Sequence, residues 1–453
     1  MAADSDLRGK ASAPPDAATD DRAPREGGPP SPHWRHRPLR WLLAQLREQT
    51  VELLHQIRRY HRVLLVFLGV LFASGLLFAW SGVYSVAATQ GHYPFFRWFL
   101  AYALRQSVET HTSGIRAPPL DDLAMVQRGA GHYQGGCAPC HGAPGYARNP
   151  ITRRMLPEPP YLPDVIGNWN QAELFWIVKH GIKYAGMPAW AAPDREDEVW
   201  SVVAFLQRLP GMDPATYRQL AYGPVANFTA GAGEGLNLLL LNGPVGGGIA
   251  ACARCHGFDG LGRDTAAFPR LTGQTADYLY ETLKNYALGA RPSGIMQPAA
   301  AFLSEEELRA LAEHFASLNP PPPLPVSDAD APLLQLGRRI AHEGLPDRNI
   351  AACAGCHGPK EGPVHSLFPR LAAQHAEYIA AQLRLWKQGL RTRTELGRVM
   401  ARAVGALHEQ RASAGYSVAR SLSEEEIRAV SLYYASLPPA EEDALAQRAP
   451  ARP

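Results

Sequence analysis

All six cysteines of this 453-residue chain lie in three copies of one pentapeptide, C-x-x-C-H. Two thiols one helical turn apart can form thioethers with the two vinyl groups of a haem, and the histidine that follows can bind the iron from the same side. This spacing is the attachment signature of c-type haem. It predicts three covalently bound haem c groups, held by Cys137, Cys140 and His141, by Cys252, Cys255 and His256, and by Cys353, Cys356 and His357.

Two other kinds of site also use paired cysteines. A structural zinc site needs four ligands, usually from two C-x-x-C pairs about 15–20 residues apart. Here the pairs lie about a hundred residues apart, and a histidine follows each one. A redox-active dithiol of the thioredoxin kind is expected once in a chain, without a histidine at every copy. The pattern therefore favours haem over both alternatives.

A haem that only carries electrons needs a sixth iron ligand, commonly methionine, which raises the reduction potential. Three methionines lie 40 to 46 residues after a motif histidine, namely Met187, Met296 and Met400. We expect each to lie in a loop before a helix and to ligate iron, the alternative being a core methionine that fills a gap. His408 is close enough to Met400 to compete as the third ligand. The methionines interpreted as packing residues are Met125, Met155 and Met212.

The overall composition excludes several classes of protein. Apolar residues make up 46% of the chain and charged residues 19%, which excludes a wholly disordered or collagen-like protein. The formal net charge is only +3 and gives no indication of a nucleic-acid partner. A chain of this length is expected to fold as about three domains.

The N-terminal 62 residues precede the longest apolar run. Residues 1–38 are rich in Pro, Ala, Asp and Arg and are expected to be disordered. Residues 39–62 have the periodicity of a basic amphipathic helix. Such a helix either lies on the inner membrane surface or is a solvated helix beside the membrane.

Residues 63–88 contain no charged residue, and about 20 apolar residues suffice to span a bilayer. Because arginines concentrate on the N-terminal side of this run, the positive-inside rule places the N-terminus in the cytoplasm and the chain after residue 88 in the periplasm. We therefore expect a retained single-pass anchor in the inner membrane. The alternative is a cleaved signal peptide, since Ser85-Val86-Ala87 resembles a cleavage site, but the long leading segment argues against it.

Composition and periodicity divide the rest of the chain into a linker at 89–120, domains at 121–222, 228–319 and 328–440, a proline-rich linker at 320–327 and a disordered tail at 441–453. The predicted fold class is all-α. Ser304 with Glu307, and Ser423 with Glu426, read as capping boxes. The last helix of each domain has one apolar face, formed by Val199, Val202, Val203 and Leu206, by Leu308, Leu311, Ala312 and Phe315, and by Ile427, Val430 and Tyr434.

The second and third domains are an internal repeat. The sequence Phe-Pro-Arg-Leu occurs at 268–271 and again at 368–371, and a glutamine and a tyrosine follow each copy at the same spacing. The offset of 100 between the copies grows to 119 at the last helix. The third domain therefore carries extra residues, chiefly at 401–420. This insert is either a partner-specific loop or a passive surface insertion.

The three motif segments and their downstream methionines resemble class I cytochrome c domains over roughly residues 121–440. The repeated pair resembles two-domain di-haem bacterial cytochromes c. The anchor with the first domain resembles membrane-anchored mono-haem cytochromes, and the three domains together resemble the tri-haem cytochrome subunit of bacterial membrane dehydrogenases.

The resemblance to the di-haem cytochromes implies contacts around the haems. It implies that Pro269 and Pro369 offer backbone carbonyls to the motif histidines of their own domains. It also implies that Arg270 and Arg370 face haem propionates, the alternative being two ordinary turn arginines.

If histidine and methionine fill both axial positions of every iron, no position remains for a substrate. We therefore expect an electron carrier that is not itself an enzyme. It would link a membrane dehydrogenase or a quinol-oxidising complex to a terminal oxidase or a soluble cytochrome. Two alternatives remain open: a haem enzyme or oxidoreductase subunit with one open iron, and a haem-based redox or gas sensor.

Overall fold

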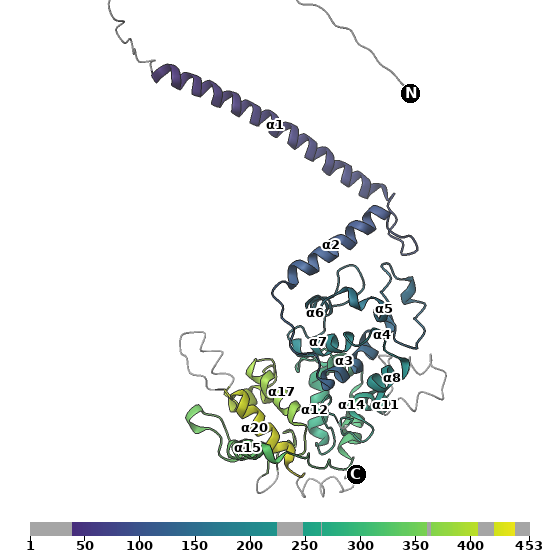
Figure 1. The fold of residues 1–453 in the computed structure, drawn as a ribbon, viewed down its shortest axis with the longest axis vertical. Helices are drawn as coiled ribbons and strands as arrows, with labels where there is room; N and C mark the ends of the chain where they lie inside the picture. Colours follow the sequence, from purple (N-terminus) through teal and green to yellow (C-terminus); the bar gives the residue numbers. More distant parts are fainter. Residues whose placement is uncertain (1–38, 224–247, 264, 360–363, 406–420, 440–453) are drawn as a thin grey trace, which may run out of the picture. The chain divides into compact units, whose positions relative to one another are not determined.

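The computed structural model describes residues 39–223, 248–263, 265–359, 364–405 and 421–439. These residues form helices and loops, and they contain no β-strand. The predicted all-α fold class is therefore confirmed (Figure 1). By its contacts the chain divides into two compact units, Met1–Val86 and Ala87–Pro453.

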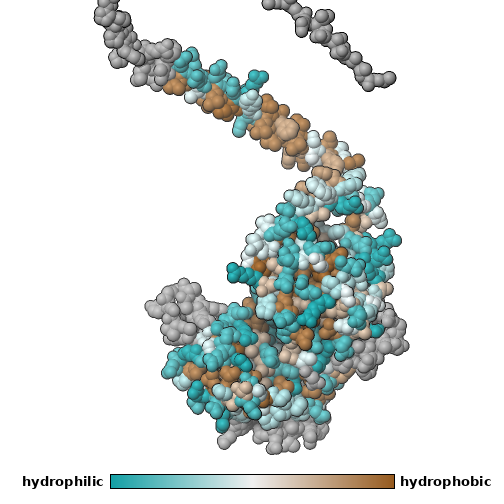
Figure 2. All heavy atoms as spheres, in the orientation of Figure 1, coloured by the Kyte–Doolittle hydropathy of each residue, from teal (hydrophilic) through white to brown (hydrophobic). Residues whose placement is uncertain are grey.

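A single helix, α1 (Leu39–Ser81), makes up the described part of the first unit. Its stretch Ala44–Ser81 is long and apolar enough to cross a membrane, and Figure 2 shows apolar residues gathered along its later part. The basic helix expected at 39–62 and the anchor expected at 63–88 are thus one continuous element. The helix ends before residue 88 because Gly82 has a φ of 63°, which stops α-helical geometry.

The first haem segment is built on helices that pack around one core. The segment 89–120, expected to be a linker, contains the first of them, and its C-terminal half packs against the domain that follows. The helices are α2 (Pro94–Thr112), α3 (Leu123–Gly136), α4 (Ala138–His141), α5 (Leu162–Val165), α6 (Gln171–His180), α7 (Glu196–Leu206) and α8 (Pro214–Tyr222), with 3-10 turns at Thr152–Arg154 and Ile166–Asn168.

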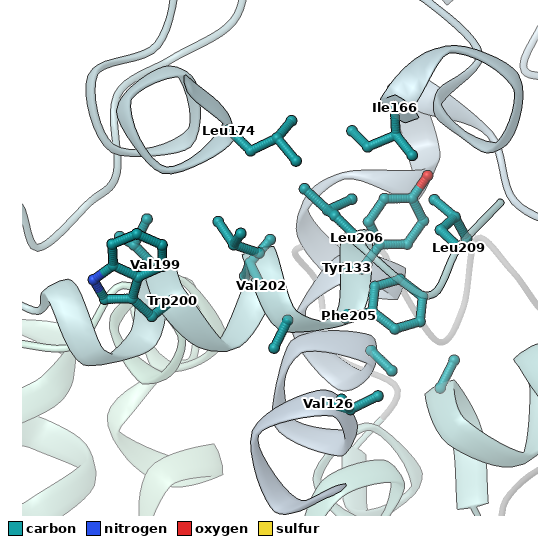
Figure 3. Packing of buried hydrophobic residues seen from close by; sticks show 14 of the residues in the cluster. Val126, Tyr133, Ile166, Leu174, Val199, Trp200, Val202, Phe205, Leu206 and Leu209 are labelled. Atoms are coloured by element: carbon teal, nitrogen blue, oxygen red, sulfur yellow. The ribbon is translucent and has the colours of Figure 1, made fainter. Parts of the chain in front are cut away.

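Figure 3 shows the core between α3 and α7, where Tyr133 and Phe205 lie beside Leu206, and Val126 lies further along α3. Their burial removes a large apolar area from water and fixes the helix that leads into the first motif.

The second and third segments have shorter helices between longer loops. The helices of the second segment are α11 (Gly248–His256), α12 (Ala276–Ala287), α13 (Met296–Ala300) and α14 (Glu305–Ala316). Those of the third are α15 (Ala331–Glu343), α16 (Ala354–His357), α17 (Ala376–Lys387), α18 (Glu395–Ala403) and α20 (Glu424–Ser436), with 3-10 turns at Asp328–Asp330 and Pro346–Arg348.

The three helices with a predicted apolar face are present, and that face is buried in each. In the first domain this helix, α7, is not the last one as predicted, because α8 follows it. Both predicted capping boxes are formed by reciprocal side-chain hydrogen bonds. A third one, between Asn170 and Glu173 at the start of α6, was not predicted. Most of the 401–420 insert lies outside the described residues.

In the first and third domains, the helix before the motif crosses the helix with the predicted apolar face at contact distance. In the first domain a Cβ at Gly129 of α3 would lie 2.0 Å from the backbone oxygen of Ser201 in α7. In the third, a Cβ at Gly337 of α15 would lie 2.1 Å from the backbone oxygen of Ala429 in α20. Only glycine fits at either crossing, so these two positions set the close packing of the helices.

The repeated domains join through a pseudo-symmetric set of hydrogen bonds. The side chain of Gln374 accepts from the backbone N–H of Arg270 at 2.9 Å and donates to its carbonyl at 2.8 Å. Gln274 makes the same two bonds to the backbone of Arg370, at 3.0 and 2.7 Å. The linker expected at 320–327 is also held, since the N–H of Leu324 donates to the carbonyl of Ala435 at 2.9 Å.

Candidate haem sites

Each C-x-x-C-H motif occupies one helical turn, so its two sulfurs and its imidazole share a face. In the first motif the N–H of His141 donates to the carbonyl of Cys137 at 2.9 Å, and His357 makes the same bond to Cys353. The second motif ends the helix α11. Residues one turn apart on a helix lie above one another, which is the arrangement that two thioethers and one iron ligand on a single ring require.

The ring of each motif histidine is oriented by a proline carbonyl. His141 Nδ1 lies 3.0 Å from the oxygen of Pro160, His256 Nδ1 lies 3.0 Å from that of Pro269, and His357 Nδ1 lies 2.9 Å from that of Pro369. A carbonyl can only accept, so Nδ1 carries the proton in all three rings and Nε2 is left as the metal-binding nitrogen. The contacts expected of Pro269 and Pro369 are present, and Pro160 makes the corresponding one that was not predicted.

Burial also favours the neutral form of these rings, which is the form that binds a metal. It lowers the pKa of His141, His256 and His357, and the proline carbonyl only partly offsets the effect. The imidazoles are therefore neutral at neutral pH, as a metal ligand must be.

The first cysteine of each motif lies in apolar surroundings. Burial raises the pKa of Cys137 to about 12, and that of Cys252 and Cys353 to about 11. Cysteines that react as redox dithiols have a lowered pKa instead. An uncharged sulfur in an apolar wall suits a thioether to haem, and this argues against the thioredoxin-like alternative.

The structure places the three candidate methionines in different local settings. Met187 lies in a loop, as expected, where the N–H of Ile182 donates to its carbonyl at 3.1 Å. Met296 is the first residue of α13, and its N–H lies 3.0 Å from the Ser293 hydroxyl. Met400 lies inside α18, not in a loop before a helix. The iron-ligand roles of all three remain predictions, and the competing His408 lies outside the described residues.

A cavity in the third domain brings the predicted groups together. Its wall includes Cys353, Cys356, His357 and Met400, so the two sulfurs, the histidine and the methionine face one apolar space. Part of the wall comes from α12 of the second domain, through residues that include Tyr278. The third site is therefore completed by the neighbouring domain.

Polar atoms in this cavity fit the carboxylates of a haem. Among the described residues, the indole N–H of Trp386 and the hydroxyl of Tyr434 are buried in the cavity wall without a hydrogen-bond partner. Buried donors of this kind are seldom left unsatisfied. The Arg391 guanidinium lies 3.8 Å from the centre of the Trp386 ring. A haem with its propionates toward Trp386 and Arg391 would satisfy the indole donor.

Two arginines, Arg291, which is buried, and Arg391, which is partly buried, were missed as candidate site residues. Arg291 and Arg391 both line the third cavity, and within the described ranges neither forms an ion pair. Arg291 donates to the Tyr378 hydroxyl at 2.8 Å, and Arg391 donates to Gln382 at 2.7 Å. Burial and the charge of Arg291 lower the pKa of Arg391. Two desolvated cations without a carboxylate form a site for anions, which the propionates of a haem would supply.

The signal for this pair was present in the sequence. Arg291 and Arg391 are related by the same offset of 100 that relates the Phe-Pro-Arg-Leu segments. The arginines that were predicted, Arg270 and Arg370, lie at the domain interface instead. Arg270 donates to the carbonyls of Pro322 and Ala373, both at 2.7 Å. Their predicted contact with propionates stays a prediction.

The first and second sites are connected by direct packing. A Cβ at Gly131 of α3 would lie 3.2 Å from Cys255 Sγ, so the first domain touches the second motif. The carboxylate of Glu198 on α7 accepts from the Ser293 hydroxyl and from the Gly294 N–H, both at 2.6 Å. The hydroxyl of the same serine accepts a hydrogen bond from the N–H of Met296. A buried carboxylate of the first domain thus shapes the loop that carries Met296.

The chain was compared with known proteins. A family model described as cytochrome C oxidase, cbb3-type, subunit III matches residues 124–206 and 249–315, which contain the first two motifs. The thiosulfate dehydrogenase electron acceptor of Stutzerimonas stutzeri is 37% identical over 187 residues, which is 41% of this chain and 79% of that protein.

Two cytochromes c4 also match. That of Azotobacter vinelandii is 32% identical over 203 residues, 42% of this chain and 86% of the relative. The crystal structure of reduced cytochrome c4 from Pseudomonas stutzeri is 30% identical with a TM-score of 0.34, over 42% of this chain and 95% of that one.

Proposed function

Because this chain belongs to the cytochrome c family, whose members bind haem c covalently, we propose that it is a membrane-anchored, periplasmic tri-haem electron carrier. The observation that carries the proposal is the arrangement found three times along the chain. In each copy a C-x-x-C-H turn presents two sulfurs and a histidine, and a proline carbonyl fixes the Nδ1 of that histidine. Haem bound there supplies a one-electron redox centre.

The contacts between domains support a relay through all three sites. The first domain touches Cys255 of the second motif, and α12 of the second domain forms part of the wall of the third cavity. Consecutive sites are therefore joined by packed protein. This packing supports transfer from one haem to the next.

The relatives support a dehydrogenase as the electron donor. One of them is a thiosulfate dehydrogenase electron acceptor, a name that describes a carrier working with an enzyme. For this chain the donor is a membrane dehydrogenase or a quinol-oxidising complex, and the acceptor is a terminal oxidase or a soluble cytochrome. The helix α1, with arginines before its apolar part, keeps the carrier at the membrane and the haem domains in the periplasm.

The proposal is tested on protein purified from membranes of a host with working haem attachment. Its intact mass should exceed that of the full polypeptide by three haem groups, and N-terminal sequencing should begin near Met1. A chain that begins near residue 88 and is released by osmotic shock would contradict the anchor. Two added haems instead of three would contradict the third site.

A further inference from the structure

The first half of α2 exposes large apolar side chains over more than half of its circumference. Seven large residues at and just before its start are between 42% and 66% exposed. We call this set the aromatic patch; it comprises Tyr93, Phe95, Phe96, Trp98, Phe99, Leu100 and Tyr102. A contiguous exposed apolar surface of this kind marks a site of interaction, so the patch requires a cover.

The aromatic patch is a formed surface held on the first domain. Its rings stack along the helix, Phe95 on Phe99 with centroids 6.5 Å apart and Trp98 on Tyr102 at 5.8 Å. The second half of α2 is fixed to the domain, where Val108 is fully buried and Arg105 lies 4.6 Å from the centre of the Trp169 ring. Figure 1 shows α2 next to α6, with which it is in contact.

The composition of this region matches a lipid interface. Trp and Tyr are enriched where a membrane meets water, since one end of each ring is apolar and the other polar. The only charged residue in the first half of α2 is Arg97, and no Asp or Glu occurs between residues 53 and 108. A long cationic side chain can keep its charge at the headgroups while its stem lies in apolar surroundings.

We infer that the aromatic patch inserts into the outer face of the membrane that α1 crosses, and so holds the first haem domain at the lipid surface. The inference rests on the anchor in the proposed function. Only residues 82–93 separate α1 from α2, a segment that spans roughly 40 Å at most, so α2 begins within reach of the headgroups. The cover that the patch requires is therefore lipid.

The test uses the full-length holoprotein in vesicles of phosphatidylcholine and phosphatidylglycerol. Since haem attachment consumes the native cysteines, Phe99→Cys introduces a single thiol for a nitroxide label. Tyr184→Cys is the matched control, because Tyr184 is 99% exposed in the same unit and far from the patch in sequence. Collisions of each label with oxygen, which partitions into lipid, and with a water-soluble nickel chelate are measured by power saturation in the reduced protein.

We expect the label at 99 to be several-fold more accessible to oxygen than to the chelate, and the label at 184 to show the reverse. Equal exposure of both labels to the chelate, with the protein still resistant to carbonate extraction, would overturn the inference and leave the anchor standing. Protection of the label at 99 from both reagents would mean that protein covers the patch, which also overturns it. Extraction by carbonate would contradict the anchor and the inference together.

Discussion

Few residues fix each candidate haem site, and most of them could be predicted from the sequence. The cysteines and histidines follow from a local motif, because one helical turn places them together whatever the rest of the chain does. Pro160 was missed because it is distant in sequence and lacks the Phe-Pro-Arg-Leu context of its counterparts. Glu198 was missed because its partners Ser293 and Gly294 belong to another domain.

Replacing Glu198 tests the link between the first two domains. In Glu198→Ala, three groups lose their buried carboxylate partner: Arg195, the Ser293 hydroxyl and the Gly294 N–H. We expect a loss of about 3 kcal/mol in the free energy of unfolding, measured from the denaturant midpoint. The control is Glu196→Ala on the same helix, where the carboxylate is 55% exposed and pairs with Lys179, and the expected loss is below about 1 kcal/mol. Equal losses in the two variants would refute the link.

The predicted ligand Met296 is tested by its effect on one reduction potential. Methionine ligation raises the potential of a haem, so Met296→His should lower one of the three potentials and leave the other two nearly unchanged. Redox titration followed in the visible spectrum measures this. Met212→Leu is the control, since Met212 only packs against the core of the first domain and its loss should move no potential. If the Met296 variant titrates like the parent protein, Met296 is a packing residue.

At the scale of elements, periodicity predicted the three final helices but not α2 or the end of α1. The first half of α2 is apolar at nearly every position, with Arg97 as its one charge, so no amphipathic period marks it as a helix. The predicted anchor runs to residue 88 because the residues from Gly82 to Ala88 carry no charge. The absence of charge does not indicate where a helix ends. The positive φ of Gly82 determines where the helix ends.

The capping box of α20 should stabilise the third domain. Ser423→Ala removes the acceptor for the Glu426 N–H at 3.2 Å and should lower the free energy of unfolding by about 1 kcal/mol at neutral pH. Burial raises the pKa of Glu426, but bonds from the Ser423 N–H and Arg348 lower it more, so the net shift is downward. The stabilisation from Glu426 is therefore full above pH ~4.3 and is lost as the pH falls further. The control Ser436→Ala, at the other end of α20, should leave the denaturant midpoint unchanged.

The crossing of α15 and α20 should tolerate no side chain at Gly337. Gly337→Ala places a Cβ against the backbone of α20 and should destabilise the third domain by about 3 kcal/mol despite the better helix propensity of alanine. Gly167→Ala in the first domain is the control, because nothing lies within 4 Å of its added Cβ and it is outside the haem motifs. Circular dichroism during denaturant unfolding compares the two. A Gly337 variant as stable as the control would show that the helices can separate without loss.

At the scale of the whole molecule, the sequence repeat predicted two similar domains but not how they join. Gln274 and Gln374 occupy equivalent positions in the two copies of the repeat. Their four hydrogen bonds depend on how the two domains pack together, which no local sequence pattern predicts. The same docking places α12 against the third cavity and brings Arg291 to its wall. The third cavity is therefore lined by two domains, and the proposed electron relay would depend on the assembled unit.

The measurement that most directly tests this account is a spectroelectrochemical titration of the full-length protein with and without carbon monoxide. If three haems each hold a histidine and a methionine, three one-electron transitions should appear per chain. All three should keep their potentials when carbon monoxide is present, because no iron has an open position. Fewer than three transitions would contradict the tri-haem carrier. A potential that rises with carbon monoxide would mean that one iron is open, and the protein would then be an enzyme or a sensor at that site.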